Sequence, residues 1–105
     1  MNQEIFERLQ KISNRLKEQY NAEKVILFGS YSTAQITEDS DLDLLIVAQT
    51  DEKFFERIAT VLSLVRDLYV GLAISPIVLK PDEVSERLKV GDQFIQEVVE
   101  KGVEI

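Results

Sequence analysis

The segment 25–47 constrains the fold of this 105-residue chain more than any other part, because it contains two short apolar runs separated by polar residues. The runs cover residues 25–28 and 42–47, and a single acid interrupts the second. Short, nearly continuous apolar runs are typical of strands that are buried on both faces of a sheet. The ten residues between Ser30 and Asp41 are enough to let the two strands lie side by side. The segment therefore predicts two neighbouring, central strands.

Apolar residues at helical spacing predict helices before and after these strands, and turn-forming residues divide the rest of the chain. In the first half of the chain, the predicted elements are a helix over 2–20 capped by Asn2 and ended by Asn21, a strand over 24–28, one or two helical turns over 30–36, a polar loop over 37–40 and a strand over 42–48. A long helix from Thr50 or Asp51 to about Tyr69, a turn at Gly71 and a strand over 73–79 are predicted next. The chain is predicted to end with a short helix that begins at Pro81 and is broken by Gly91, and a last helix capped by Asp92 and ended by Gly102.

Two details of the last third of the chain bear on packing. Pro76 cannot donate a hydrogen bond to a neighbouring strand, so the strand over 73–79 is predicted to lie at an edge or to be bulged there. The last helix is predicted to have four apolar residues on one face: Phe94, Ile95, Val98 and Val99. Together the elements predict one α/β (α+β) domain over residues 1–105, with a small mixed sheet of about three to five strands and helices packed on it.

The composition excludes several kinds of chemistry. The chain has no cysteine and no histidine, which rules out disulfides, thiolate metal sites and every catalytic triad that uses histidine. Its net charge is −7 and no basic patch is evident, so we expect no autonomous binding to DNA or RNA. No apolar run approaches the roughly 18 residues of a membrane span, and no signal peptide is recognisable. We therefore expect a cytoplasmic protein without a membrane segment.

Asp41 and Asp43 are two residues apart where the second strand begins. Side chains alternate along a strand, so both carboxylates point to the same face, roughly 6.5–7 Å apart at the backbone. Two such carboxylates repel each other unless a cation lies between them. Mg²⁺ fits because it binds one or two carboxylates and keeps its other positions for phosphate and water, and a bridging carboxylate allows a second ion. Taken alone, the two acids could also be the solvated end of a loop.

Gly29 and Ser30 follow directly after the first strand. Glycine lets a phosphate approach the backbone closely, a helix start offers free N–H groups, and the serine hydroxyl adds a donor. A nucleoside triphosphate could thus lie with its phosphates on these two residues and its metal on Asp41 and Asp43. Taken alone, a Gly-Ser pair after a strand is usually a turn followed by an N-cap.

The combination is more specific than its parts. The pair Gly29-Ser30, followed after ten residues by Asp41 and Asp43 in an apolar strand, resembles the signature of the DNA polymerase β-like nucleotidyltransferase superfamily. The order of elements resembles its small, stand-alone prokaryotic members, the minimal nucleotidyltransferases, over nearly the whole chain. The resemblance implies a polymerase β palm-like nucleotidyltransferase fold, phosphate binding by Gly29 and Ser30, and one or two Mg²⁺ ions held by the catalytic Asp41 and Asp43.

The third predicted strand departs from the family pattern. Active members usually carry a third carboxylate there, whereas this chain has Ser75 at about that position, and the nearest acids, Asp67 and Asp82, lie outside the strand. In two-metal chemistry such a group helps to position the metal on the nucleophile side and can act as a base. Its absence puts catalysis in question more than nucleotide binding.

Three functions follow from these observations. The resemblance implies an Mg²⁺-dependent transfer of AMP from ATP, or of another nucleotide from its NTP, to an acceptor, and it implies a helical HEPN-domain toxin encoded nearby as partner, with this chain as an antitoxin. The missing acid motivates an alternative, a weak or inactive nucleotidyltransferase-fold protein that inhibits such a partner by binding. A third interpretation is a structural domain in which Asp41 and Asp43 bind nothing.

Overall fold

The computed structural model describes residues 3–29 and 41–105, so Asn2, Ser30 and the turns and loop predicted over 30–40 lie outside the described residues. Within these ranges the elements are α1 (Gln3–Gln19), β1 (Ala22–Phe28), β2 (Asp41–Ala48), α2 (Phe54–Leu64), the 3₁₀ helix η2 (Arg66–Leu68), β3 (Ala73–Leu79), α3 (Pro81–Lys89), α4 (Gln93–Lys101) and β4 (Val103–Glu104). The four strands of the described chain form one sheet in the order β3-β2-β1-β4. β1 is antiparallel to β2 and to β4, whereas β2 and β3 are parallel. This mixed sheet confirms the predicted fold class.

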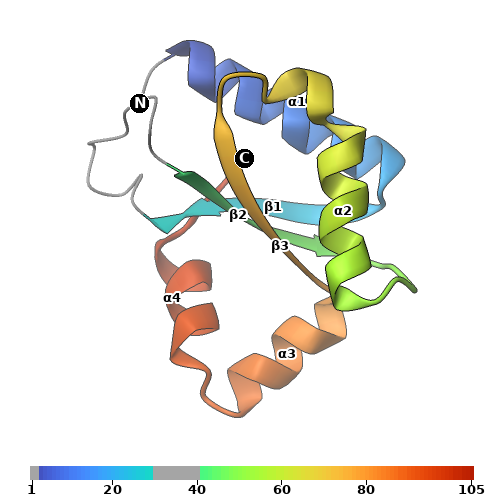
Figure 1. Ribbon diagram of the computed structural model, residues 1–105. Helices are drawn as coiled ribbons and strands as arrows, with labels where there is room; N and C mark the ends of the chain where they lie inside the picture. The colour runs from blue at the N-terminus through green and yellow to red at the C-terminus, as the bar shows by residue number, and fades with distance from the viewer. Residues whose placement is uncertain (1–2, 30–40) are drawn as a thin grey trace.

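Helices cover both faces of the sheet (Figure 1). α1 and α2 pack on one face, where Leu9, Ile12 and Leu16 of α1 meet alternate side chains of β1 and β2. α3 and α4 lie on the opposite face, where Ile95 and Val98 of α4 pack on the other alternate side chains of the same strands. Both faces of β1 and β2 are therefore apolar, which explains their nearly continuous apolar sequences. No helix in the described ranges combines the length and the apolar character needed to cross a membrane.

Most predicted positions are confirmed. α1 ends two residues before Asn21, which has a left-handed backbone with φ of 55° and turns the chain into β1. β3 lies at one edge of the sheet, as the proline at position 76 predicts. Pro81 is the first residue of α3, and the Asp92 side chain caps α4 by accepting a 3.1 Å hydrogen bond from the Ile95 N–H.

The start of the helix after β2 differs from the prediction. The first helical residue of α2 is Phe54, and neither Thr50 nor Asp51 caps it; the N-cap is Lys53, without a side-chain hydrogen bond. Instead of capping α2, the Thr50 hydroxyl accepts a 3.1 Å hydrogen bond from the Glu52 N–H, in the turn that precedes the helix. This local turn delays the helix by about one turn, because it holds the backbone in a non-helical conformation.

The far end of α2 also comes earlier than the predicted Tyr69. The helix ends at Leu64, and η2 continues after Val65, whose φ of −113° and ψ of 15° depart from helical values. Arg15 of α1 donates a 3.1 Å hydrogen bond to the Leu64 carbonyl. This contact satisfies a carbonyl at the helix end, so the change to a tighter helix leaves that group paired.

The face of α4 and the segment that follows it were predicted incompletely. Ile95 and Val98 are buried as expected, but Phe94 and Val99 are each 46% exposed, so these two do not belong to the core face. Gly102 ends the helix at the predicted position, and the next two residues form β4 along β1. A Cβ atom at Gly102 would lie 2.4 Å from Ile26 Cγ2, so glycine is needed for the close approach of α4 to β1.

Candidate functional site

The predicted site residues lie where β1 ends and β2 begins, on the face covered by α3 and α4. Phe28 of β1 is paired with Asp43 of β2, and Asp43 is paired with Ser75 of β3. Residues paired across neighbouring strands project from the same face, so these three form one row across the sheet. Asp41 lies two residues before Asp43 on the same face, opposite Ala73. The predicted neighbourhood of the first two strands is thus confirmed.

Gly29 lies directly against the Asp43 carboxylate. Its φ is +83°, a left-handed value that side-chain-bearing residues rarely adopt. A Cβ atom built there would lie 2.3 Å from Asp43 Oδ2, so the absence of a side chain is what lets the carboxylate approach the backbone. The structure therefore brings Gly29, Asp41 and Asp43 together, while Ser30 lies outside the described residues.

The two carboxylates of the site differ in exposure. Asp41 is exposed, whereas Asp43 is half-buried between Gly29 and the neighbouring strands. Partial burial raises the pKa of Asp43 above its ordinary value, and the negative charge of Asp41 raises it further. Both effects disfavour the ionised form of Asp43. A cation held between the two carboxylates would remove this disadvantage.

This electrostatic cost predicts a stability change. A raised carboxyl pKa means that the native state binds more protons than the unfolded state, so stability falls as the pH rises through that window. We expect Asp43→Asn to raise the Tm of the metal-free protein at pH 7 by about 2 °C. The gain should vanish at a pH below the ordinary aspartate pKa, where both proteins are uncharged at this position. Thermal melts in EDTA at the two pH values measure it, and a lowered Tm at pH 7 would contradict it.

A third carboxylate does not join the pair within the described residues, in which no group of three potential metal ligands is found. Ser75 lies in register with Asp43, at the position where the family pattern led us to expect an acid. Asp67 forms an ion pair with Arg15 of α1, which holds the Asp67 pKa below its ordinary value. Asp82 lies in the first turn of α3 and accepts a 3.0 Å hydrogen bond from the Glu83 N–H.

The chemistry of this pair fits a magnesium ion. Two carboxylates on one face of a strand offer hard oxygen ligands, and because burial and the charge of Asp41 raise the pKa of Asp43, a bound cation would favour its ionised form. The glycine next to Asp43 keeps the backbone side of the site free of a side chain. Asp41 and Asp43 are therefore the residues that would hold the ion.

A cavity of about 330 Å³ adjoins this site. Phe28, Gly29 and Asp43 line one side of it, and α4 forms the other side. This volume lies in the range of sites that bind small molecules. The carboxylate of Asp43 is thus at the wall of a cavity that could receive part of a nucleotide.

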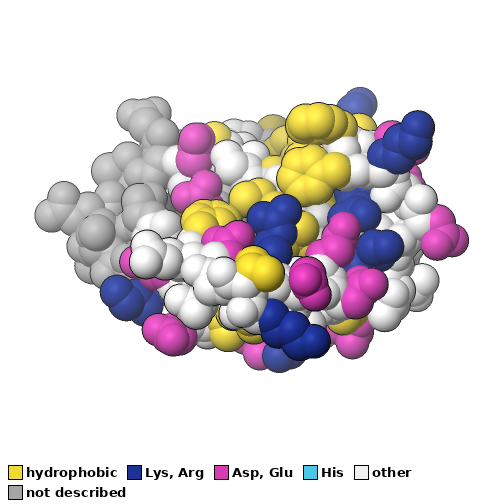
Figure 2. All heavy atoms as spheres, turned by 90° about the horizontal axis from the view of Figure 1, so that it is seen from below, with side chains coloured by type: hydrophobic (Ala, Val, Ile, Leu, Met, Phe, Trp, Pro, Cys, Tyr) yellow, Lys and Arg dark blue, Asp and Glu magenta, His cyan; other side chains and the backbone are white. Residues whose placement is uncertain are grey.

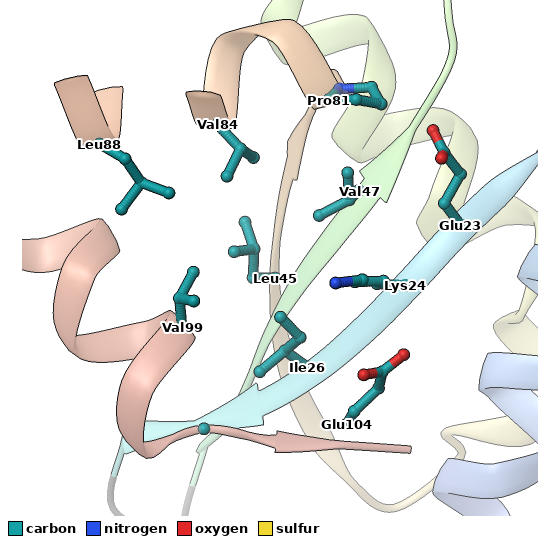
Figure 3. A pocket seen from close by; sticks show the side chains of 11 residues that line it. Glu23, Lys24, Ile26, Leu45, Val47, Pro81, Val84, Leu88, Val99 and Glu104 are labelled. Atoms are coloured by element: carbon teal, nitrogen blue, oxygen red, sulfur yellow. The ribbon is translucent and has the colours of Figure 1, made fainter. Parts of the chain in front are cut away.

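A second cavity, of about 400 Å³, lies on the same face but away from the acid pair (Figure 3). Its apolar lining comes from the sheet, α3 and α4, with seven side chains: Ile26, Leu45, Val47, Pro81, Val84, Leu88 and Val99. Its charged residues are Glu23, Lys24 and Glu104, and Lys24 extends across the floor from β1 (Figure 3). Although larger, this cavity is not lined by Gly29, Asp41 or Asp43, so its size does not make it the catalytic site.

The charges on this side of the molecule are mixed. Figure 2 shows acidic and basic side chains interspersed over the described part of the face with α3 and α4, with hydrophobic side chains among them. A nucleic-acid site usually shows a basic patch or stripe instead. The view thus agrees with the expected lack of autonomous nucleic-acid binding, which stays a prediction.

Sequence reasoning missed the contribution of α4 to the site. Glu97 and Lys101 line the smaller cavity together with Phe94 and Val98. These positions follow the spacing i, i+3, i+4 and i+7, so one helical face was visible in the sequence. The pattern could not say that this face lies beside the end of β1, because that depends on how α4 crosses the sheet.

Comparison with known proteins agrees with the geometry. Residues 10–105 match the family described as "Polymerase beta, Nucleotidyltransferase". A "Putative protein adenylyltransferase" of Methanocaldococcus jannaschii is 35% identical over 96 residues, 90% of each chain. A second protein of that description from the same organism is 34% identical over 79 residues, 73% of this chain and 77% of its own. No solved structure matches. The family match covers most of the chain and includes Gly29, Asp41 and Asp43, and this chain belongs to the polymerase β-like nucleotidyltransferase family.

Proposed function

We propose that this chain transfers AMP from ATP to an acceptor protein with the help of Mg²⁺. The observation that carries the proposal is the contact between the Gly29 backbone and the Asp43 carboxylate, with Asp41 on the same face and a cavity beside them. A phosphate chain needs close access to backbone and metal at once, and this arrangement offers both. The relatives described as protein adenylyltransferases support AMP as the transferred group and a protein as the acceptor.

Each residue has a defined role in this reaction. Asp41 and Asp43 would hold the ion, and Gly29 with Ser30 would bind the phosphates and orient the α-phosphorus. The ion, when bound, neutralises charge on the phosphates and polarises the reacting centre. An acceptor hydroxyl oxygen forms a bond to the α-phosphorus, the bond from that phosphorus to the bridging oxygen breaks, and pyrophosphate leaves. The hydroxyl proton passes to solvent, because Ser75 offers no carboxylate beside Asp43.

The acceptor that the family resemblance suggests is a helical HEPN-domain toxin encoded nearby. Modification of such a partner would make this chain an antitoxin. The net charge of −7 suits association with a basic, RNA-binding protein, because complementary charges accelerate encounter and favour the correct partner.

A second candidate function follows from Ser75. Its position beside Asp43 leaves two carboxylates among the described residues of the site, where family members usually have three. The chain would then bind the nucleotide and inhibit its partner by association, with little or no transfer.

Labelled ATP separates the two functions. The chain is incubated with Mg²⁺, the product of the neighbouring gene, and ATP that carries the label on either the α- or the γ-phosphate. Nucleotidyl transfer places the α-label, but not the γ-label, on the partner protein. A partner that is inhibited without acquiring α-label would overturn the transferase and support the inhibitor.

A carboxylate at position 75, beside Asp43, is expected to increase the transfer activity. Replacing Ser75 with aspartate places a carboxylate next to Asp43, where it can help to position metal and accept a proton. We expect the transfer rate to rise by about tenfold or more, since a well-placed general base contributes on the order of a hundredfold. The matched control is Ser75→Asn, because asparagine has the shape of aspartate without its charge. Equal rates for the two variants would contradict the prediction.

A further inference from the structure

The smaller cavity has one helical wall. Phe94, Glu97, Val98 and Lys101 lie on one face of α4, opposite Gly29 and Asp43. Val98 is buried against the sheet and anchors this face. The other three side chains present an aromatic ring, a carboxylate and an ammonium group along one side of a cavity that ends at the acid pair.

Phe94 packs against a second aromatic ring although it is exposed. Its ring packs edge-to-face on Phe28, with centroids 5.5 Å apart and an interplanar angle of 79°, and 46% of the residue is exposed. Ile95 and Val98 already fix α4 on the sheet, so Phe94 is not needed to close the core. Single exposed apolar residues are common on protein surfaces. This one differs because it lines the cavity next to Asp43 and is oriented by a second ring.

Lys101 is the one cation among the described residues that line this cavity. It is 3.6 Å from the Glu97 carboxylate, and the two side chains are 72% and 67% exposed. Such an exposed pair one turn apart on a helix is weak, so a phosphate can replace Glu97 as the partner of Lys101 at little cost. Near Asp41 and Asp43, an additional cation would favour a polyanionic ligand.

We propose that α4 is the nucleoside-binding wall of the site: the Phe94 ring stacks on the base, and the Lys101 ammonium contacts a phosphate. The inference rests on the proposed nucleotide binding and adds residues that lie outside the Gly-Ser and Asp-x-Asp pattern. The cavity of about 330 Å³ is large enough for a nucleoside. Any base has a face that can stack, so the wall selects for a nucleoside over bare polyphosphate.

The test compares ATP with tripolyphosphate, which has the phosphates but no nucleoside. Isothermal titration with Mg²⁺ measures the Kd of both ligands for the whole chain. We expect Phe94→Ala to weaken ATP binding about tenfold, a typical effect of losing one stacking ring, and to leave tripolyphosphate unchanged. Lys101→Ala should weaken both ligands about fivefold. Phe94→Tyr keeps the ring and should bind ATP as the unchanged protein does.

Phe55→Ala is the matched control. Phe55 also packs edge-to-face on a neighbouring ring, that of Phe54, is 80% exposed and lies on α2, outside this cavity. It should leave both Kd values unchanged. Phe94→Leu provides a second variant with an apolar side chain in case the alanine variant does not fold.

Two outcomes would overturn the inference. If Phe94→Ala and Phe94→Leu bind ATP as tightly as the Phe55→Ala control while Asp43→Asn loses binding, the nucleotide site stands and its nucleoside lies elsewhere. If the unchanged protein binds neither ATP nor tripolyphosphate in the presence of Mg²⁺, both the nucleotide site and its α4 wall are wrong.

Discussion

Asp43→Asn is expected to lower the rate of nucleotidyl transfer about a thousandfold, the equivalent of ~4 kcal/mol of transition-state stabilisation. The substitution keeps the shape of the side chain against Gly29 but removes the charge that would hold the metal beside the phosphates. Because the metal-free variant should be slightly more stable than the unchanged protein, the loss cannot be attributed to unfolding. The rate of α-label transfer to the partner measures the effect.

The control for this loss is Asp51→Asn. Asp51 is an exposed acid in the loop between β2 and α2, and it does not line the cavity beside Asp43. Its replacement should leave the transfer rate unchanged. A similar rate for Asp43→Asn and Asp51→Asn would show that the acid pair does not carry the reaction.

Arg57→Ala is expected to lower the free energy of unfolding by about 3 kcal/mol. Arg57 is only 6% exposed, and its guanidinium donates to the carbonyls of Glu52 and Val78, at 2.9 and 3.1 Å, and to Glu83 Oε1 at 2.7 Å. It thereby ties α2 to the edge strand β3 and to the start of α3. Truncation removes the donor to the carbonyl of the buried Val78 and the charged partner of the Glu83 carboxylate.

Urea unfolding measures this loss, with Arg87→Ala as control. Arg87 is paired with Asp92 at 3.5 Å but is 47% exposed at its side chain, so its loss should change stability by less than about 1 kcal/mol. Equal effects of the two substitutions would mean that the buried position of Arg57 does not matter.

The contact between Arg57 and Glu83 also makes the stability of the native state depend on pH. The hydrogen bond from Arg57 lowers the pKa of Glu83 below its ordinary value. Unfolded Glu83 thus binds a proton more readily than the native residue, and its stabilising contribution is lost as the pH falls through the ordinary glutamate pKa towards the lowered one.

Much of the fold could be predicted because local signals agree with the packing. The two central strands are apolar on both faces, and proline at position 76 correctly indicated an edge strand. The late start of α2 could not be predicted, because the Thr50 hydroxyl accepts a hydrogen bond from the Glu52 N–H in the preceding turn instead of capping the helix. β4 has only two residues and depends on Gly102 fitting against Ile26, a contact that no local pattern reveals.

The candidate site was predictable to a similar extent. The ten-residue connection allowed the first two strands to be predicted as neighbours, and their antiparallel pairing in the structure brings Asp43 beside the end of β1, against Gly29. The family pattern put Ser75 at about the position of a third acid, and the parallel pairing of β2 and β3 places it beside Asp43. The α4 wall was missed because the position of Phe94 and Lys101 depends on tertiary packing rather than on spacing.

The assignment of the nucleotide site is tested most directly by following backbone amide signals by NMR during titration with ATP and Mg²⁺. We expect the largest shifts at Gly29, Asp41, Asp43 and Lys101, and we expect these shifts to disappear in EDTA. Shifts concentrated instead at Val84 and Leu88, in the larger cavity, or the absence of shifts at millimolar ATP, would contradict the assignment of the nucleotide site to the ends of β1 and β2.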